Sequence, residues 1–148
     1  MEKILNSIPK KGNVVIIGYP ATGKTFLLDT IITACRVRAS TYHTDDYIKH
    51  GFVEALYVLM EEISKDKTPL KIIEGVLGYR LIRKGIELHT FHADLVIVCE
   101  ASVPTRTARI ALRGKLVQPT LSMDKGLNKV WEDCKDTGSV GKVIKWSN

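Results

Sequence analysis

The sequence GYPATGKT, residues 18–25, fits the pattern G-x-x-x-x-G-K-[ST] of a phosphate-binding loop. Four apolar residues, 14–17, come directly before it, and apolar residues at helical spacing follow it over 26–35. A strand before the loop and a helix after it distinguish a true phosphate-binding loop from a chance match. The alternative, an ordinary glycine-rich turn, requires neither element. We therefore expect residues 18–25 to bind a nucleoside triphosphate.

The two glycines of this loop allow its backbone N–H groups to point inward toward an anion, and the following helix adds its positive N-terminal end. Lys24 is expected to reach the β- and γ-phosphates, and the Thr25 hydroxyl to bind Mg²⁺. ATP and Mg²⁺ are therefore the expected cofactors. The loop residues expected to contact the nucleotide are Gly18, Tyr19, Pro20, Ala21, Thr22, Gly23, Lys24 and Thr25.

The length and composition are those of an ordinary globular chain. With 148 residues, of which 45% are hydrophobic and 26% charged, we expect one domain, 1–148, with a single core. No apolar run approaches the length of a membrane span, and residues 1–12 lack the apolar stretch of a secretory signal. Cys35, Cys99 and Cys134 are far apart, which predicts free thiols rather than disulfides. These features predict a cytoplasmic protein.

The chain is basic, with a formal net charge of +6. A basic balance indicates an anionic partner. The phosphates of ATP account for part of this charge, and a nucleic acid would account for more. A basic surface without a specific partner is the alternative. No membrane partner is expected, and the sequence does not indicate an oligomeric state.

Apolar runs alternate with helical patterns along the chain, after a short basic lead-in at 1–12. The apolar runs predict strands at 13–17, 40–43, 70–73, 94–99 and 140–146. The helical patterns predict helices at 23–37, 48–65, 78–88, 102–114 and 122–136, with Ser102 as an N-cap. In the helix at 48–65, the expected buried face is Phe52, Leu56, Leu59 and Ile63. This alternation predicts a parallel α/β sheet covered on both faces, with ligands at the carboxyl ends of its strands.

Three acidic residues follow predicted strands and are therefore expected at this edge. Asp45 and Asp46 come after the second strand, where a carboxylate can orient an acceptor hydroxyl and take its proton. The alternative is a turn or helix cap, which suits Asp46 better than Asp45. Glu74 ends the third strand and is a candidate Mg²⁺ ligand together with Thr25 and Asp45, or else an exposed carboxylate at the end of a strand.

Two groups of residues beyond the third and fourth strands are candidates for binding substrate and nucleotide. Tyr79, Arg80 and Arg83 follow Glu74 and are expected to hold the acceptor, although an ordinary solvated helix face explains them equally well. Spacings of three and four residues place three arginines on one face of the helix at 102–114, opposite Ala108 and Leu112, which suit packing. We expect these three arginines to lie over the triphosphate and stabilise charge during phosphoryl transfer, or else to form a solvated basic face: Arg106, Arg109 and Arg113.

The four histidines do not have the spacing of a metal site, because His89 and His92 lack a carboxylate or cysteine partner at ligand spacing. We therefore expect structural or surface roles for His43, His50, His89 and His92.

The segments GYPATGKT, TDDY, IIEGV and VPTRTARIALRGK, at 18–25, 44–47, 72–76 and 103–115, together resemble the small P-loop kinases. This group includes uridine, pantothenate and gluconate kinases and the polynucleotide kinase domain. The resemblance implies a three-layer α/β/α fold with a parallel five-stranded sheet in the order 2-3-1-4-5. It also implies that Asp45 acts on the acceptor hydroxyl, that Glu74 supports Mg²⁺, and that a lid helix at about 102–115 carries arginines over ATP.

The resulting hypothesis is a P-loop kinase that moves the γ-phosphate of ATP·Mg²⁺ to a hydroxyl acceptor. The chain is shorter than most nucleoside kinases, and it leaves little room for a domain that encloses a small substrate. The acceptor is therefore either nucleoside-like or a hydroxyl in a polynucleotide, such as a hydroxymethylated base in DNA. A kinase of a small non-nucleotide metabolite, and a P-loop ATPase or switch without an acceptor alcohol, are the alternatives.

Overall fold

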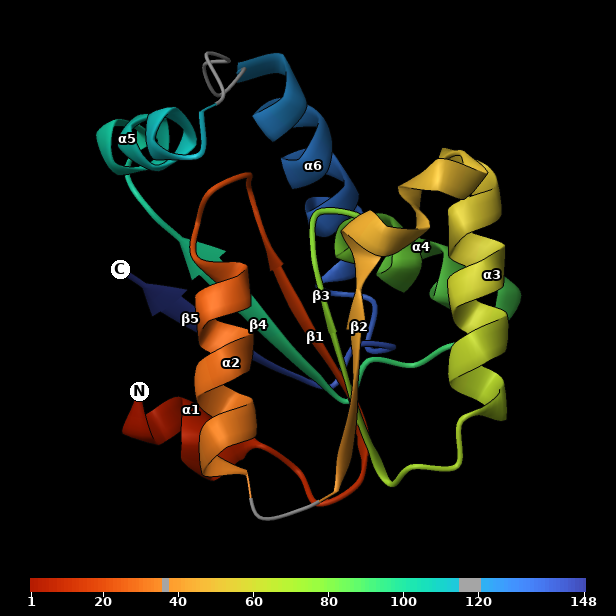
Figure 1. Ribbon diagram of the computed structural model, residues 1–148. Coiled ribbons are helices and arrows are strands. Elements are labelled where there is room, and N and C mark those ends of the chain that lie inside the picture. Colours follow the sequence, from red (N-terminus) through yellow and green to blue (C-terminus); the bar gives the residue numbers. More distant parts are fainter. Residues whose placement is uncertain (36–37, 115–120) are drawn as a thin grey trace.

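The computed structural model describes residues 1–35, 38–114 and 121–148. Its centre is a five-stranded sheet in which every pairing is parallel and the strand order is β2-β3-β1-β4-β5 (Figure 1). The predicted order 2-3-1-4-5 is therefore confirmed. The strands are β1 (Gly12–Gly18), β2 (Ala39–His43), β3 (Leu70–Glu74), β4 (Leu95–Glu100) and β5 (Lys142–Ser147).

Helices cover both faces of this sheet. One face packs against α1 (Glu2–Ser7) and α2 (Lys24–Ala34), and the other packs against α3 (Phe52–Lys65), α4 (Gly78–Leu88) and α6 (Leu121–Cys134). The two core clusters divide β1 by alternation, because Val14 and Ile16 face the first group of helices and Val15 and Ile17 face the second. All four side chains have no exposed surface, as expected for a central strand covered on both faces.

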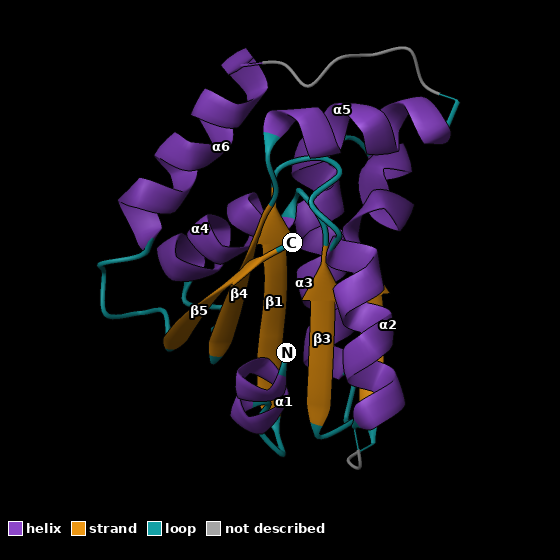
Figure 2. Ribbon diagram, turned by 90° about the vertical axis from the view of Figure 1, so that its left-hand side faces the viewer, coloured by secondary structure: helices purple, strands orange, loops and turns teal. Residues whose placement is uncertain are grey.

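The helix α5 (Val103–Leu112) lies across the carboxyl edge of the sheet, above the ends of the strands (Figure 2). Its start agrees with the sequence, since the Ser102 hydroxyl accepts a hydrogen bond from the Thr105 backbone N–H at 3.3 Å. None of the described helices is long and apolar enough to cross a membrane.

The structure corrects two predictions at the level of elements. Residues 2–7 form α1, whose Ile4 is buried against the sheet, where only a short basic lead-in was expected. The helix expected at 48–65 is divided: a 3₁₀ segment, η1 (Thr44–His50), is followed by Gly51, whose φ of 87° ends the turn before α3 begins. Phe52 is consequently the first residue of α3, and its side chain is 63% exposed instead of buried.

Candidate active site

The phosphate-binding loop joins β1 to α2, as the sequence predicts. Ala21 and Gly23 have φ values of 63° and 90°, so the loop passes twice through the left-handed region. A side chain at Gly18 would lie 2.8 Å from the Cys99 carbonyl oxygen, and this close approach to β4 requires glycine. The loop therefore has a strained, tightly packed backbone in front of the N-terminus of α2, a geometry suited to an anion.

Lys24 lies at the first position of α2 with 9% of its surface exposed. Its Nζ donates a hydrogen bond to the Tyr19 carbonyl oxygen at 2.9 Å, across the loop. Burial lowers the pKa of this ammonium, and the negative charges of Glu74 and Asp45 act in the opposite direction. Lys24 is thus a buried cation fixed to the loop by this hydrogen bond, and the charges of Glu74 and Asp45 favour its charged form.

Glu74 is buried at the end of β3, and one of its oxygens has two neighbours. Its Oε1 lies 3.5 Å from the Thr25 hydroxyl and 2.7 Å from the Nδ1 of His43. His43 is the partner of Glu74 in the parallel register of β2 and β3, so the two strand ends are level. The sequence analysis did not predict this contact of His43. The only indication in the sequence is that His43 and Glu74 each stand at the end of a predicted strand.

Asp45 and Asp46 are both exposed in η1, just beyond the end of β2. Only Asp45 is among the charges that act on Lys24, while the charge of Asp46 acts on Tyr47. The helix-cap interpretation of Asp46 finds no support, because no side chain caps η1 or α3. Of the two carboxylates, Asp45 is therefore the one whose charge raises the pKa of Lys24.

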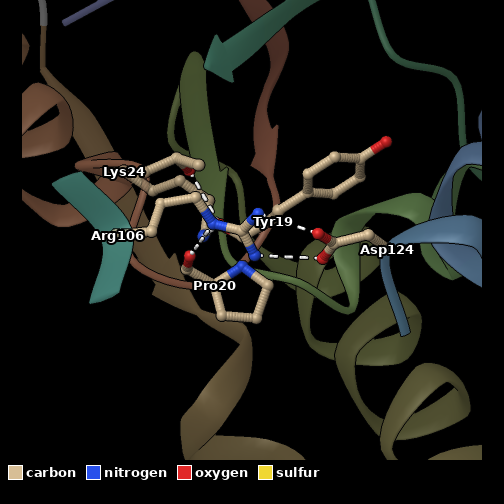
Figure 3. A network of polar contacts seen from close by, with 6 residues as sticks. Tyr19, Pro20, Lys24, Arg106 and Asp124 are labelled. Atoms are coloured by element: carbon tan, nitrogen blue, oxygen red, sulfur yellow. Dashed lines mark hydrogen bonds and ion pairs between the residues drawn. The ribbon is translucent and has the colours of Figure 1, made fainter. Parts of the chain in front are cut away.

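Arg106 is the largest buried polar group beside this loop, with 2% of its surface exposed. Its Nε donates to the Pro20 carbonyl oxygen at 2.8 Å, and its two terminal nitrogens donate to the Asp124 carboxylate at 2.8 and 3.0 Å (Figure 3). The guanidinium carbon also lies 5.2 Å from the centre of the Tyr19 ring. All these contacts hold the loop in place, so Arg106 has a structural use that the sequence did not predict.

Of the other two arginines, Arg109 contacts the loop, and Arg113 is exposed directly after the end of α5. Arg109 donates to the Ala21 carbonyl oxygen at 3.1 Å and to the Asn148 side chain, and the charge of Arg113 acts on Lys24. Arg106 and Arg109 thus share the face of α5 that contacts the loop, whereas the expected place of Arg113 over the triphosphate stays a prediction. The expected packing of Ala108 and Leu112 is wrong: both are exposed, Leu112 by 88%, because the arginine face is the one turned toward the protein.

The three residues expected to hold the acceptor do not lie together in the structure. Tyr79 is buried with its ring stacked against Tyr19 at 6.5 Å between centroids, and both line a pocket of about 480 Å³ between the end of β4 and α6. Arg80 is exposed and Arg83 half-buried, on the outer side of α4, where they line a separate groove against α3.

An aromatic pair beside the loop was not predicted. The rings of Phe26 and Trp146 stack with centroids 6.3 Å apart, and Phe26 remains 65% exposed directly after Thr25. Next to them, the Asn148 side chain donates to the Thr22 carbonyl oxygen at 2.8 Å. The C-terminal end of β5 therefore contacts the phosphate-binding loop, a proximity that follows from strand order and not from any local motif.

Solved structures of two kinases have a similar fold. The deoxyadenosine kinase from M. mycoides with bound dATP has a TM-score of 0.57 at 14% sequence identity, covering 90% of this chain and 90% of that chain. The shikimate kinase from Acinetobacter baumannii in complex with shikimate has a TM-score of 0.50 at 12% identity, covering 100% of this chain and 89% of that chain. Comparison with protein-family models and with curated proteins finds no match.

The sheet order, the loop between β1 and α2, and these structural neighbours together define the class: this chain has the α/β fold of the P-loop kinases. At such low identities the likeness establishes the fold alone, and the chemistry must be argued from the residues of the site.

Proposed function

We propose that this protein is a P-loop kinase that transfers the γ-phosphate of ATP to a hydroxyl group of an acceptor. The observation that carries the proposal is the site at the phosphate-binding loop, where Lys24 is buried and the Glu74 carboxylate lies 3.5 Å from the Thr25 hydroxyl. A nucleotide-binding module needs the loop and the lysine. The additional carboxylate at the end of β2 is what an attacking alcohol requires.

Thr25, at the start of α2, and Glu74, at the end of β3, fit a Mg²⁺ site. The Thr25 hydroxyl and the Glu74 carboxylate present oxygen atoms 3.5 Å apart, and oxygen ligands are those that this ion prefers. No group of three histidine, cysteine or acidic side chains that could hold a metal ion occurs in the described ranges, which suits an ion held mainly by phosphates and water. When bound, Mg²⁺ would neutralise charge on the β- and γ-phosphates.

The proposed steps use this chain's own groups. Lys24 exchanges its hydrogen bond to the Tyr19 carbonyl for one to the triphosphate, and the loop N–H groups hold the phosphates. Asp45 orients the acceptor hydroxyl and takes its proton while the hydroxyl oxygen bonds to the γ-phosphorus. The bond from that phosphorus to the bridging oxygen breaks, and ADP leaves. Arg109, which contacts the loop, and Arg113, directly after α5, stabilise the charge on the transferred group.

The exposed ring of Phe26, stacked on Trp146 beside the loop, is a flat apolar surface that a nucleotide base can cover. We assign the base of ATP to this surface. The acceptor we propose is either nucleoside-like or a hydroxyl in a polynucleotide, the latter including a hydroxymethylated base in DNA.

The test compares Asp45→Asn with Asp46→Asn, two neighbouring exposed carboxylates of which only one acts on Lys24. Phosphate transfer from radiolabelled ATP is measured with nucleosides, sugars and hydroxyl-bearing oligonucleotides, and ATP affinity is measured separately. We expect Asp45→Asn to lower transfer by about 100-fold or more while ATP affinity changes little, and Asp46→Asn to retain transfer. Full transfer by the Asp45→Asn variant contradicts the assignment of the base. ATP hydrolysis that no acceptor changes contradicts the kinase and favours an ATPase.

A further inference from the structure

A groove of about 140 Å³ runs between α3 and α4 on the outer side of the molecule. Its walls differ in chemistry. The α3 side is apolar, and the α4 side carries charged side chains. The residues lining it are Phe52, Val53, Leu56, Arg80, Arg83, Lys84 and Glu87.

The two arginines of this groove are unpaired within the described part of the chain. Lys84 forms an ion pair with Glu87 at 3.2 Å, on the same helix. Arg80 and Arg83 make no hydrogen bond or ion pair with any residue in the described ranges of the chain. The groove therefore presents two free guanidinium groups on one side of α4, about one helical turn apart.

Two neighbouring side chains of the apolar wall are exposed. Phe52 and Val53 have 63% and 62% of their surface in contact with solvent, at the start of α3. Neither side chain belongs to the two core clusters, so the fold does not account for them. An exposed phenyl ring beside two unpaired guanidinium groups is a combination that binds a ligand with both a flat apolar part and anionic groups.

We infer that this groove binds a single-stranded polynucleotide, with a base stacked on Phe52 and backbone phosphates on Arg80 and Arg83. Stacking on an aromatic ring next to a cationic track is how proteins hold single strands with little sequence preference. The net charge of +6 supports the same anionic partner. An acidic peptide would pair with the arginines and leave the ring unused. The groove has few neutral hydrogen-bonding side chains with which to read the edge of a single free base.

Two residues of the groove are close in sequence to residues of the candidate site. Phe52 is separated from η1 by Gly51 alone, and Arg80 is in the first turn of α4, which follows Glu74 and the end of β3. A strand bound there would enter the region of Asp45, so its hydroxyl would be the acceptor. This last step rests on the proposed phosphotransferase function, whereas binding of the strand in the groove does not.

The test measures binding of a short fluorescein-labelled oligodeoxythymidine in the absence of ATP. Fluorescence anisotropy gives the affinity at salt concentrations from about 50 to about 200 mM. Phe52→Ala should weaken binding about fivefold or more, the usual effect of losing one stacked base. Arg83→Gln should reduce the slope of log affinity against log salt by about 0.7, as for one lost phosphate contact on a single strand. Tyr57→Ala, an exposed aromatic of α3 outside the groove, and Lys11→Gln, an exposed lysine before β1, should leave binding unchanged.

Three results overturn the inference: no binding at low salt, equal binding of the wild type and the Phe52→Ala and Arg83→Gln variants, or equal affinity for thymidine monophosphate and the oligonucleotide. Thermal unfolding of each variant checks that it is folded. Oligonucleotide binding without phosphate transfer to any acceptor would refute the proposed function and still support binding in the groove. Transfer to a small acceptor without oligonucleotide binding would support the proposed function and refute binding in the groove.

Discussion

Arg106 of α5 and Asp124 of α6 form a buried ion pair with two parallel hydrogen bonds of 2.8 and 3.0 Å. The same guanidinium donates to the Pro20 carbonyl oxygen in the phosphate-binding loop. The two helices that flank residues 115–120 are therefore joined to each other and to the loop through a single side chain. The backbone of the loop depends on this contact for part of its support.

Removing either partner should destabilise the protein. Arg106→Ala or Asp124→Ala leaves a largely buried charge without its partner, since the two side chains are 2% and 13% exposed, and we expect a loss of about 3 kcal/mol in the free energy of unfolding. The double variant should be little worse than either single variant, because the two share one interaction. Urea unfolding of the three variants measures these differences.

The same variants distinguish two roles of Arg106 in nucleotide binding. If Arg106 acts by fixing Pro20, both Arg106→Ala and Asp124→Ala weaken ATP binding, because both release the loop. If Arg106 binds the triphosphate instead, Asp124→Ala frees the guanidinium and ATP affinity is kept or increased. Titration calorimetry with ATP separates the outcomes, and we expect the first.

His43 should position Glu74 for metal binding. The His43 imidazole lies 2.7 Å from the Glu74 carboxylate, whose other described neighbour is the Thr25 hydroxyl. Partners that orient a ligating carboxylate typically contribute about 10-fold or more to metal affinity. We expect His43→Ala to raise the Mg²⁺ concentration that gives half-maximal ATP turnover by about this factor, with a smaller change in the maximal rate. His43→Asn, which keeps a donor, should restore part of the loss; an unchanged Mg²⁺ requirement in His43→Ala would contradict this role.

Features of the site encoded in short segments of sequence could be predicted. The phosphate-binding loop has a fixed spacing between Gly18 and Lys24, and the buried strands are continuous apolar runs, so the sheet and its carboxyl edge follow from local patterns. The N-cap at Ser102 is equally local. The strand order then brings Glu74 to the loop, as expected.

Features that depend on contacts between distant segments could not be predicted. The spacing of the α5 arginines gave their common face, but Arg106 is buried because Asp124, on another helix, lies opposite it. The role of His43 depends on the register of β2 with β3. Phe52 matches the apolar period of its helix, yet the break at Gly51 makes it the first residue of α3 and leaves it exposed.

Gly75, at the start of the connection from β3 to α4, should tolerate no side chain. A Cβ at this position would lie 1.9 Å from the Thr44 hydroxyl oxygen, and its φ of 137° disfavours other residues. Thr44 is fully buried directly before Asp45, so Gly75→Ala should displace the residue that positions the proposed base. We expect the free energy of unfolding to fall by about 3 kcal/mol or more, and phosphate transfer to be lost.

Gly51→Ala is the matched control for this change. Gly51 also has a positive φ, 87°, but no atom lies within 4 Å of the place where its Cβ would be. It should therefore lose only the cost of its backbone conformation (φ 87°, ψ 155°), roughly 1–3 kcal/mol, and remain active. Equal destabilisation by the two substitutions would show that backbone conformation, and not the contact with Thr44, accounts for the effect at Gly75.

Asp66, just after α3, should make stability depend on pH. Its carboxylate accepts hydrogen bonds from the Tyr42 hydroxyl and, at 2.8 Å, from the Thr68 backbone N–H, and these bonds hold its pKa well below the ordinary value of 3.8. A carboxyl whose pKa is lower in the folded state stabilises the protein above the unfolded pKa, and this contribution is lost as the pH falls through the folded pKa. Because the group is partly solvated, we expect Asp66→Asn to lower the free energy of unfolding by only about 1 kcal/mol at pH 7. The difference in the free energy of unfolding between the variant and the wild type should shrink below pH 3.8.

Urea unfolding across this pH range measures the difference. Asp29→Asn is the control, because the Asp29 carboxylate has no hydrogen-bond or ion-pair partner in the described ranges. A difference that stays constant with pH would mean that the asparagine variant loses packing and not a charged hydrogen bond.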